Sequence, residues 1–177
     1  YVSSWDVSTY NAFAADRGAA AFSETTFDPV IGYDPGITAG GPAPYPTFAG
    51  GSSTYFLRSA TDSAASATAY ATGVKTDNGN IAWKRNDPAA GQLTALPDEL
   101  RRRWGYSFGV VTTVAFNHAT PAAFSSHNVS RGNYSAIAYE IILSTRPDVV
   151  VGGGHPDWGT TYFSAASLTA LRANTDY

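Results

Sequence analysis

The chain has 177 residues, a formal net charge of −3 and an isoelectric point near 5.5, which disfavours nucleic-acid binding because that function needs a basic face. It contains no cysteine, which excludes disulfides and thiolate metal sites within the chain. No stretch approaches the ~20 consecutive apolar residues that span a bilayer, so we expect no membrane span in this segment.

The N-terminal region, residues 1–58, is rich in aromatic residues, Gly and Pro, a composition typical of a variable segment. Within it, residues 33–51 predict a long surface loop, because Gly and Pro interrupt regular structure. The chain begins at Tyr1, contains no Met and stops just after a predicted helix that follows Ser164. We therefore expect it to be part of a longer protein.

Helical and strand patterns alternate through the rest of the chain. A small-residue helix comes first, followed by a helix that Gly105 ends and by a β-branched run typical of a buried strand. A short helix opened by Pro121, a longer helix and a short apolar strand come next. The predicted elements are helices 62–72, 96–104, 121–126 and 134–144, and strands 108–114 and 148–151. This order predicts an α/β fold, with helices on the faces of a mostly parallel sheet.

The basic run Arg101 to Arg103 lies late in the second of these helices. Cations at a helix C-terminus complement the helix dipole, and their long stems cover apolar neighbours. A solvated helix end therefore explains this run better than a nucleic-acid contact does.

Candidate chemistry begins at the start of helix 62–72. Asp62 precedes Ser63, and the residues that follow are small, so the helix can bury its start without covering the hydroxyl. Free N–H groups and the dipole at a helix N-terminus favour an attacking alkoxide and a phosphate oxygen. Further along, His118, Thr120 and Arg131 follow strand 108–114, and α/β folds bind ligands beyond the carboxyl ends of strands.

Three sequence blocks, taken together, resemble the alkaline phosphatase family of the bacterial type. They are TDSAASATAYATGVKT at 61–76 with DNG at 77–79, NHATPAAF at 117–124 with SHNVSRGNY at 126–134, and PDVVVGGGHP at 147–156. The resemblance implies one partial domain of a three-layer α/β sandwich. Residues 59–157 would form its nucleophile and phosphate-binding core, and residues 158–177 would begin a truncated helix.

The resemblance also implies a mechanism, namely hydrolysis of phosphate monoesters through a phosphoserine intermediate. Ser63 is implied as the nucleophile, Arg131 as the clamp on the phosphate oxygens, and Asp62 as the group that orients the site by bonding Arg131 or backbone. Two Zn²⁺ ions and one Mg²⁺ ion are implied as cofactors, with Ser63, Thr120 and His118 as candidate ligands. Phosphate monoesters and inorganic phosphate would be the small-molecule partners.

His118 departs from part of the family, because some bacterial relatives carry Asp at this position and others carry His. An imidazole lacks the charge of a carboxylate, so the resemblance implies altered ion selectivity at the third metal site. The alternative is a histidine that merely forms a structural hydrogen bond near a strand end. His127, expected on the short helix after Pro121, and His155 are not expected to bind metal.

Three further expectations rest on the family alone: a homodimer, a periplasmic or extracellular location, and a metal cage completed by residues that this chain lacks. The isolated segment should then be inactive. A Ser-His-Asp hydrolase is disfavoured, because no Gly-x-Ser-x-Gly elbow surrounds Ser63. The arylsulfatase relatives fit less well, since they use a modified nucleophile in another sequence context. A catalytically idle phosphatase fold with a structural or surface-assembly role remains the alternative.

Overall fold

The structure of the chain is a computed structural model, and it describes residues 7–16, 18–28 and 61–153 together with residues 165, 169, 172 and 173. Its helices are α1 (Val7–Asp16), α3 (Ser63–Thr72), α4 (Leu96–Trp104), α5 (Ala119–Ala122) and α6 (Tyr134–Tyr139), with a π-helix, η3 (Glu140–Thr145). Its strands are β1 (Gly109–Ala115) and β2 (Val149–Gly153). None of the described helices is long and apolar enough to cross a membrane.

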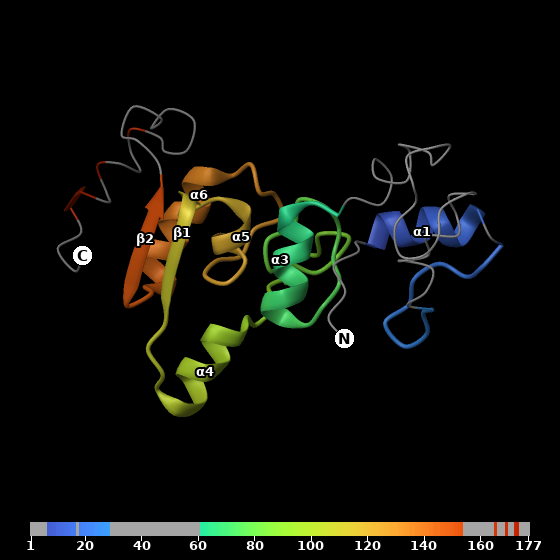
Figure 1. Cartoon of the computed structure of the whole chain (residues 1–177), viewed down its shortest axis with the longest axis horizontal. Coiled ribbons are helices and arrows are strands. Elements are labelled where there is room, and N and C mark those ends of the chain that lie inside the picture. Colours follow the sequence, from blue (N-terminus) through green and yellow to red (C-terminus); the bar gives the residue numbers. More distant parts are fainter. Residues whose placement is uncertain are drawn as a thin grey trace.

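The two strands pair in parallel, as expected for an α/β fold, with Val110 opposite Val150. The connection between them runs through α5, α6 and η3, and Figure 1 shows α6 near the two strands. Val150 of β2 packs against the core cluster that contains Ile137 of α6 and Ile141 of η3. The prediction that strand 108–114 is buried is wrong for part of it, since Val111 is 76% exposed. Alternate residues of a strand point to opposite faces, so Val110 is buried while Val111 is not.

The core is built largely from small side chains where α3 packs against α5. Small residues let two helix backbones approach closely, and isoleucines from the neighbouring segments fill the remaining space. The buried members of this cluster are Ala64, Ala67, Ile81, Ala119, Ala122, Ala123, Ile137, Ile141 and Ile142. The close packing fixes the N-terminal half of α3 relative to α5.

The helix predicted for residues 121–126 instead begins at Ala119 and ends at Ala122. A proline is tolerated throughout a first helical turn, where N–H groups have no intrahelical partner, so Pro121 does not mark the first position. Past the helix, the hydroxyls of Ser125 and Ser126 donate to the carbonyls of Pro121 and Ala122 at 2.9 and 3.1 Å. Such local side-chain bonds compete with continued helix.

The helix predicted for residues 134–144 is present, but its hydrogen-bonding pattern widens at Glu140, where α6 passes into η3. The π-helix closes with the N–H of Arg146 donating to the carbonyl of Ile141 at 2.8 Å, and Arg146 adopts a φ of 50°. Pro147 then cannot continue the helix because it lacks an N–H group. The chain turns directly into β2.

His127 lies after α5, not on it, and joins three segments of the fold. Its Nδ1 lies 2.7 Å from Oε1 of Glu140, and its Nε2 lies 2.9 Å from the carbonyl oxygen of Leu93. Its backbone N–H also donates to Oε2 of Glu140 at 3.0 Å. Since both ring nitrogens face acceptors, the ring donates to both only when it carries two protons. These contacts agree with the structural role expected of His127.

Near the N-terminus, α1 and the segment after it form a smaller cluster around Tyr10 and Phe22. The N–H of Val7 donates to the carbonyl of Thr76 at 3.2 Å, which ties α1 to the segment after α3. The predicted loop 33–51 and His155 lie outside the described residues. Of the predicted C-terminal helix, Ala165, Thr169, Arg172 and Ala173 are helical and exposed, and the rest lies outside the described residues.

The contacts of His127 predict that stability falls as the pH becomes alkaline. Burial lowers the pKa of His127, but the hydrogen bond and charge of Glu140, the Leu93 carbonyl and the charge of Asp98 outweigh it and raise the pKa above 6.5. The stabilisation is therefore complete below pH 6.5 and is lost as the pH rises through the raised pKa. A charge-assisted hydrogen bond contributes roughly 2 kcal/mol.

We expect His127→Gln to remove this pH dependence and to lower stability by about 2 kcal/mol at pH 6. Denaturant unfolding of the full-length protein between pH 6 and pH 9 measures both. Glu140→Gln is the matched variant, because it removes the negative partner and should flatten the same profile. An unchanged pH profile in His127→Gln would contradict the account.

Candidate active site

The candidate site is organised by Asp62, which is the N-cap residue of α3. Asp62 has extended backbone angles, φ −69° and ψ 164°, and its Oδ1 accepts from the N–H of Ala65 at 2.8 Å. This bond satisfies one of the N–H groups that the first helical turn leaves without an intrahelical partner. Ser63 is consequently the first residue of the helix, as the sequence predicts.

The second carboxylate oxygen of Asp62 reaches across to the loop that carries Arg131. Oδ2 accepts from Nη1 of Arg131 at 3.1 Å and from the N–H of Gly79 at 3.0 Å. Both side chains of the ion pair remain partly accessible, 30% for Arg131 and 24% for Asp62. The expected contacts of Asp62 with Arg131 and with backbone are thus both present, although the sequence blocks that carry the two residues are far apart.

A turn at Asn78 and Gly79 connects Asp62 with Arg131. Oδ1 of Asn78 accepts from the N–H of Asp62 at 3.0 Å, and the carbonyl of Gly79 accepts from the N–H of Arg131 at 2.7 Å. Sequence reasoning did not select Asn78 or Gly79 as site residues. The Asn-Gly dipeptide signals a turn, but nothing local to it shows which distant residues the turn contacts.

Ser63 is half-buried, while Ala64 and Ala65 after it are fully buried. Within the described part of the chain, no hydrogen bond engages its hydroxyl, and none joins it to Thr120. The hydroxyl sits at the positive end of α3, where an approaching anion and a developing alkoxide are both favoured. The arrangement can therefore bind an oxyanion beside a nucleophile.

His118 is the N-cap residue of α5, and its ring stacks on Tyr134 with centroids 6.2 Å apart and planes at 23°. Burial lowers the pKa of His118, and the positive charge of Arg131 lowers it further. A neutral imidazole can act as a metal ligand or as a hydrogen-bond acceptor. Thr120, two residues on, is exposed at the start of the helix that packs against α3.

The described residues do not complete a metal cage. Across residues 7–16, 18–28 and 61–153, no group of three or more His, Cys, Asp and Glu side chains is placed to hold a metal ion. The carboxylate of Asp62 is already engaged by Ala65, Gly79 and Arg131. Ser63, His118 and Thr120 are therefore at most part of a ligand set.

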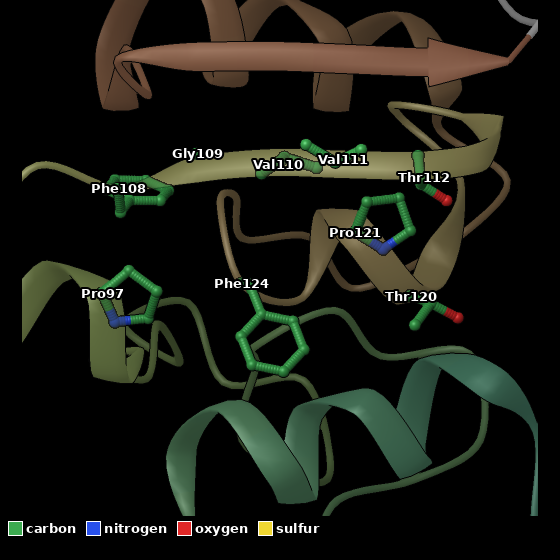
Figure 2. A pocket seen from close by; sticks show the side chains of 9 residues that line it. All are labelled: Pro97, Phe108, Gly109, Val110, Val111, Thr112, Thr120, Pro121 and Phe124. Carbon is green, nitrogen blue, oxygen red and sulfur yellow. The ribbon is translucent and has the colours of Figure 1, made fainter.

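An apolar cavity of about 290 Å³ lies beside the site, between α4, β1 and α5. Figure 2 shows its apolar side chains, with Thr120 at one edge of the group. It is lined by Pro97, Phe108, Gly109, Val110, Val111, Thr112, Thr120, Pro121 and Phe124. This lining contains no ionisable side chain, so the cavity lacks the groups that a phosphate would need.

A family model for alkaline phosphatase matches residues 44–163. The chain is 43% identical over 99 residues to alkaline phosphatase 4 of Bacillus subtilis, and 39% identical over 119 residues to streptomycin-6-phosphate phosphatase of Streptomyces griseus. These alignments cover 53% and 57% of the chain but only 21% and 26% of the relatives.

The solved structures that the chain resembles are alkaline phosphatases as well. A cold-active alkaline phosphatase from Shewanella sp. has a TM-score of 0.52 and 48% identity, over 64% of this chain and 26% of that one. The alkaline phosphatase of the Antarctic bacterium TAB5 has a TM-score of 0.53 and 30% identity, over 64% and 32%. A mutant of the TAB5 enzyme was solved with Mg bound in its M3 site. The predicted fold class, part of an alkaline-phosphatase-like α/β sandwich, is confirmed.

The contacts of Asp62 predict a graded loss of stability. Asp62→Ala removes the helix cap and the partner of Arg131, and losing an N-cap alone costs about 1–2 kcal/mol. Asp62→Ser keeps a capping oxygen but is too short to bridge to Arg131, so it should recover most of this loss. Denaturant unfolding of the full-length protein measures both. Equal stability of Asp62→Ala and the unaltered protein would contradict the capping role.

Proposed function

The chain belongs to the alkaline phosphatase family, and we propose that the full-length protein hydrolyses phosphate monoesters with Ser63 as nucleophile and Arg131 as phosphate clamp. The observation that carries the proposal is the carboxylate of Asp62, which caps the helix of Ser63 and bonds Arg131 at 3.1 Å. One side chain thereby brings together a hydroxyl, a helix N-terminus and a guanidinium. These are the groups that phosphoryl transfer requires of a protein.

The proposed reaction has two displacements at phosphorus. Ser63 Oγ attacks the phosphoryl group, the bond to the substrate alcohol breaks, and the alcohol leaves with the proton that the Ser63 hydroxyl gives up. Water then attacks the phosphoserine, the P–Oγ bond breaks, a proton from the water returns to Oγ and inorganic phosphate departs. Arg131 is suited to hold the equatorial oxygens, because a guanidinium presents a planar fork of donors and Asp62 uses only its Nη1 in the ion pair.

The proposal includes two Zn²⁺ ions and one Mg²⁺ ion as the resemblance implies, with Ser63, His118 and Thr120 as this chain's donors. Oxygen donors suit Mg²⁺ and imidazole suits Zn²⁺, so these side chains are chemically suitable. The described residues form no complete metal cage, so they would need further ligands from elsewhere in the full-length protein. Bound metal ions would supply Lewis-acid activation of the hydroxyl and of the leaving oxygen.

The absence of a complete cage from the described residues also suits the alternative, a catalytically idle phosphatase fold or an inactive segment. The proposed phosphatase and the idle alternative differ in one measurable respect, which is turnover by the full-length protein when metal is bound. A homodimer and a periplasmic or extracellular location are part of the proposal through the family alone. Sedimentation and cell fractionation test them.

We expect Ser63→Ala to lower kcat for p-nitrophenyl phosphate by at least about 10³-fold, because no other hydroxyl takes the nucleophile's place. Ser66→Ala is the matched control, since Ser66 is a half-buried serine of the same helix and makes no side-chain hydrogen bond among the described residues. It should retain wild-type turnover. Full activity in Ser63→Ala would overturn the proposed mechanism, and a metal-loaded wild-type protein without turnover would favour the idle fold.

A further inference from the structure

We propose that the turn formed by Asn78 and Gly79 is a positioning element for the reaction, which sets the guanidinium of Arg131 relative to the hydroxyl of Ser63. This inference rests on the proposed function, because it assigns the turn a task in that same site. Neither residue is expected to touch the substrate.

The turn holds the start of α3 through both the backbone and the side chain of Asp62. Oδ1 of Asn78 accepts from the N–H of Asp62 at 3.0 Å. The N–H of Gly79 donates to Oδ2 of the same residue at 3.0 Å. Two bonds from adjacent residues of the turn thus fix the residue that directly precedes Ser63.

The same turn holds Arg131. The carbonyl of Gly79 accepts from the N–H of Arg131 at 2.7 Å, while the side chain of Arg131 bonds the Asp62 oxygen that Gly79 also bonds. Asp62, Gly79 and Arg131 therefore form a closed ring of hydrogen bonds. Just beyond the turn, Ile81 and Asn128 exchange both backbone bonds at 2.8 Å, which aligns the two segments.

The residue types match this task better than they match a packing role. Gly79 has a φ of 93°, a conformation that side chains disfavour, yet a Cβ built there would meet nothing within 4 Å. Glycine is thus required by conformation and not by space. Asn78 is exposed, so its side chain does not fill the core, and a single exposed hydrogen bond contributes little to stability.

The effect on the reaction should be larger than the effect on stability. A misplacement of about 1 Å between reacting groups can cost roughly 10²-fold in rate. Asn78 lies outside the ring and bonds the N–H of Asp62, so the ring stays closed without it and a partial displacement is expected. We therefore expect kcat/KM of Asn78→Ala for p-nitrophenyl phosphate to fall about tenfold, with the inhibition constant of inorganic phosphate rising by a similar factor.

The experiment uses the full-length protein and a matched control. Asn11 makes the same kind of bond in the N-terminal cluster, where its Oδ1 accepts from the N–H of Phe22 at 2.7 Å. Asn11→Ala removes that bond far along the chain from the site and should leave kcat/KM and the inhibition constant unchanged. Gly79→Ala is the second variant, which strains the same turn without a steric clash and should lower kcat/KM in the same direction.

A double variant with Arg131→Ala separates a positioning effect on Arg131 from a general structural effect of the turn. In an Arg131→Ala background, no guanidinium remains to be positioned, so adding Asn78→Ala should lower kcat/KM less than about threefold. An equal loss in both backgrounds would show that the turn does not act through Arg131 and would overturn the inference. Wild-type kcat/KM and phosphate inhibition in Asn78→Ala would overturn it too, while leaving the proposed function intact.

Failure of the proposed function gives a different pattern. If Ser63→Ala keeps full turnover, the nucleophile is wrong, and the inhibition constant of inorganic phosphate in Asn78→Ala then decides this inference by itself. A rise of about tenfold supports it, because phosphate binding needs Arg131 but not Ser63. If the wild-type protein neither hydrolyses p-nitrophenyl phosphate nor binds inorganic phosphate by calorimetry, both proposals are wrong.

Discussion

The carboxylate of Asp62 accepts from three donors that come from different parts of the chain: the N–H groups of Ala65 and Gly79, and the guanidinium of Arg131. All three partners are donors, so the site needs a group that only accepts. An ionised carboxylate meets this need, whereas an amide would turn its NH₂ group toward at least one donor. The position of Arg131 and the start of α3 therefore depend on this one side chain.

The packing of small residues on α3 helps to hold Asp62 and its partners in place. Thr68, fully buried on that helix, donates to the carbonyl of Asn80 at 3.0 Å and accepts from the N–H of Ala82 at 2.9 Å. The segment that follows the Asn78 turn is thereby fixed to the helix that carries Ser63. Because alanines dominate the contact of α3 with α5, the first turns of the two helices, which carry Ser63 and Thr120, are held close together. These two helices thus carry Ser63 and Thr120.

The sequence predicted what depends on local chemistry. The helix of Ser63 follows from its Asp62 cap and ends at Thr72, and Gly105 ends α4 as expected, with a left-handed φ of 66°. Parallel pairing followed from the helix between the strands. Other features were missed or misplaced: the two-sided turn at Gly79, which distant contacts set, the π-helix that starts at Glu140, and the exposure of Val111. Turn residues and strand patterns do not encode which segment lies across from them.

The central claim is that the geometry around Asp62 makes Ser63 the phosphoryl acceptor. Rapid acid quenching of the full-length, metal-loaded protein with ³²P-labelled inorganic phosphate, followed by peptide mapping, tests this claim most directly, because acid preserves a phosphoserine and stops its hydrolysis. The account predicts label on the peptide that contains Ser63 and on no other. Label on a different residue, or none while turnover is measurable, would contradict it.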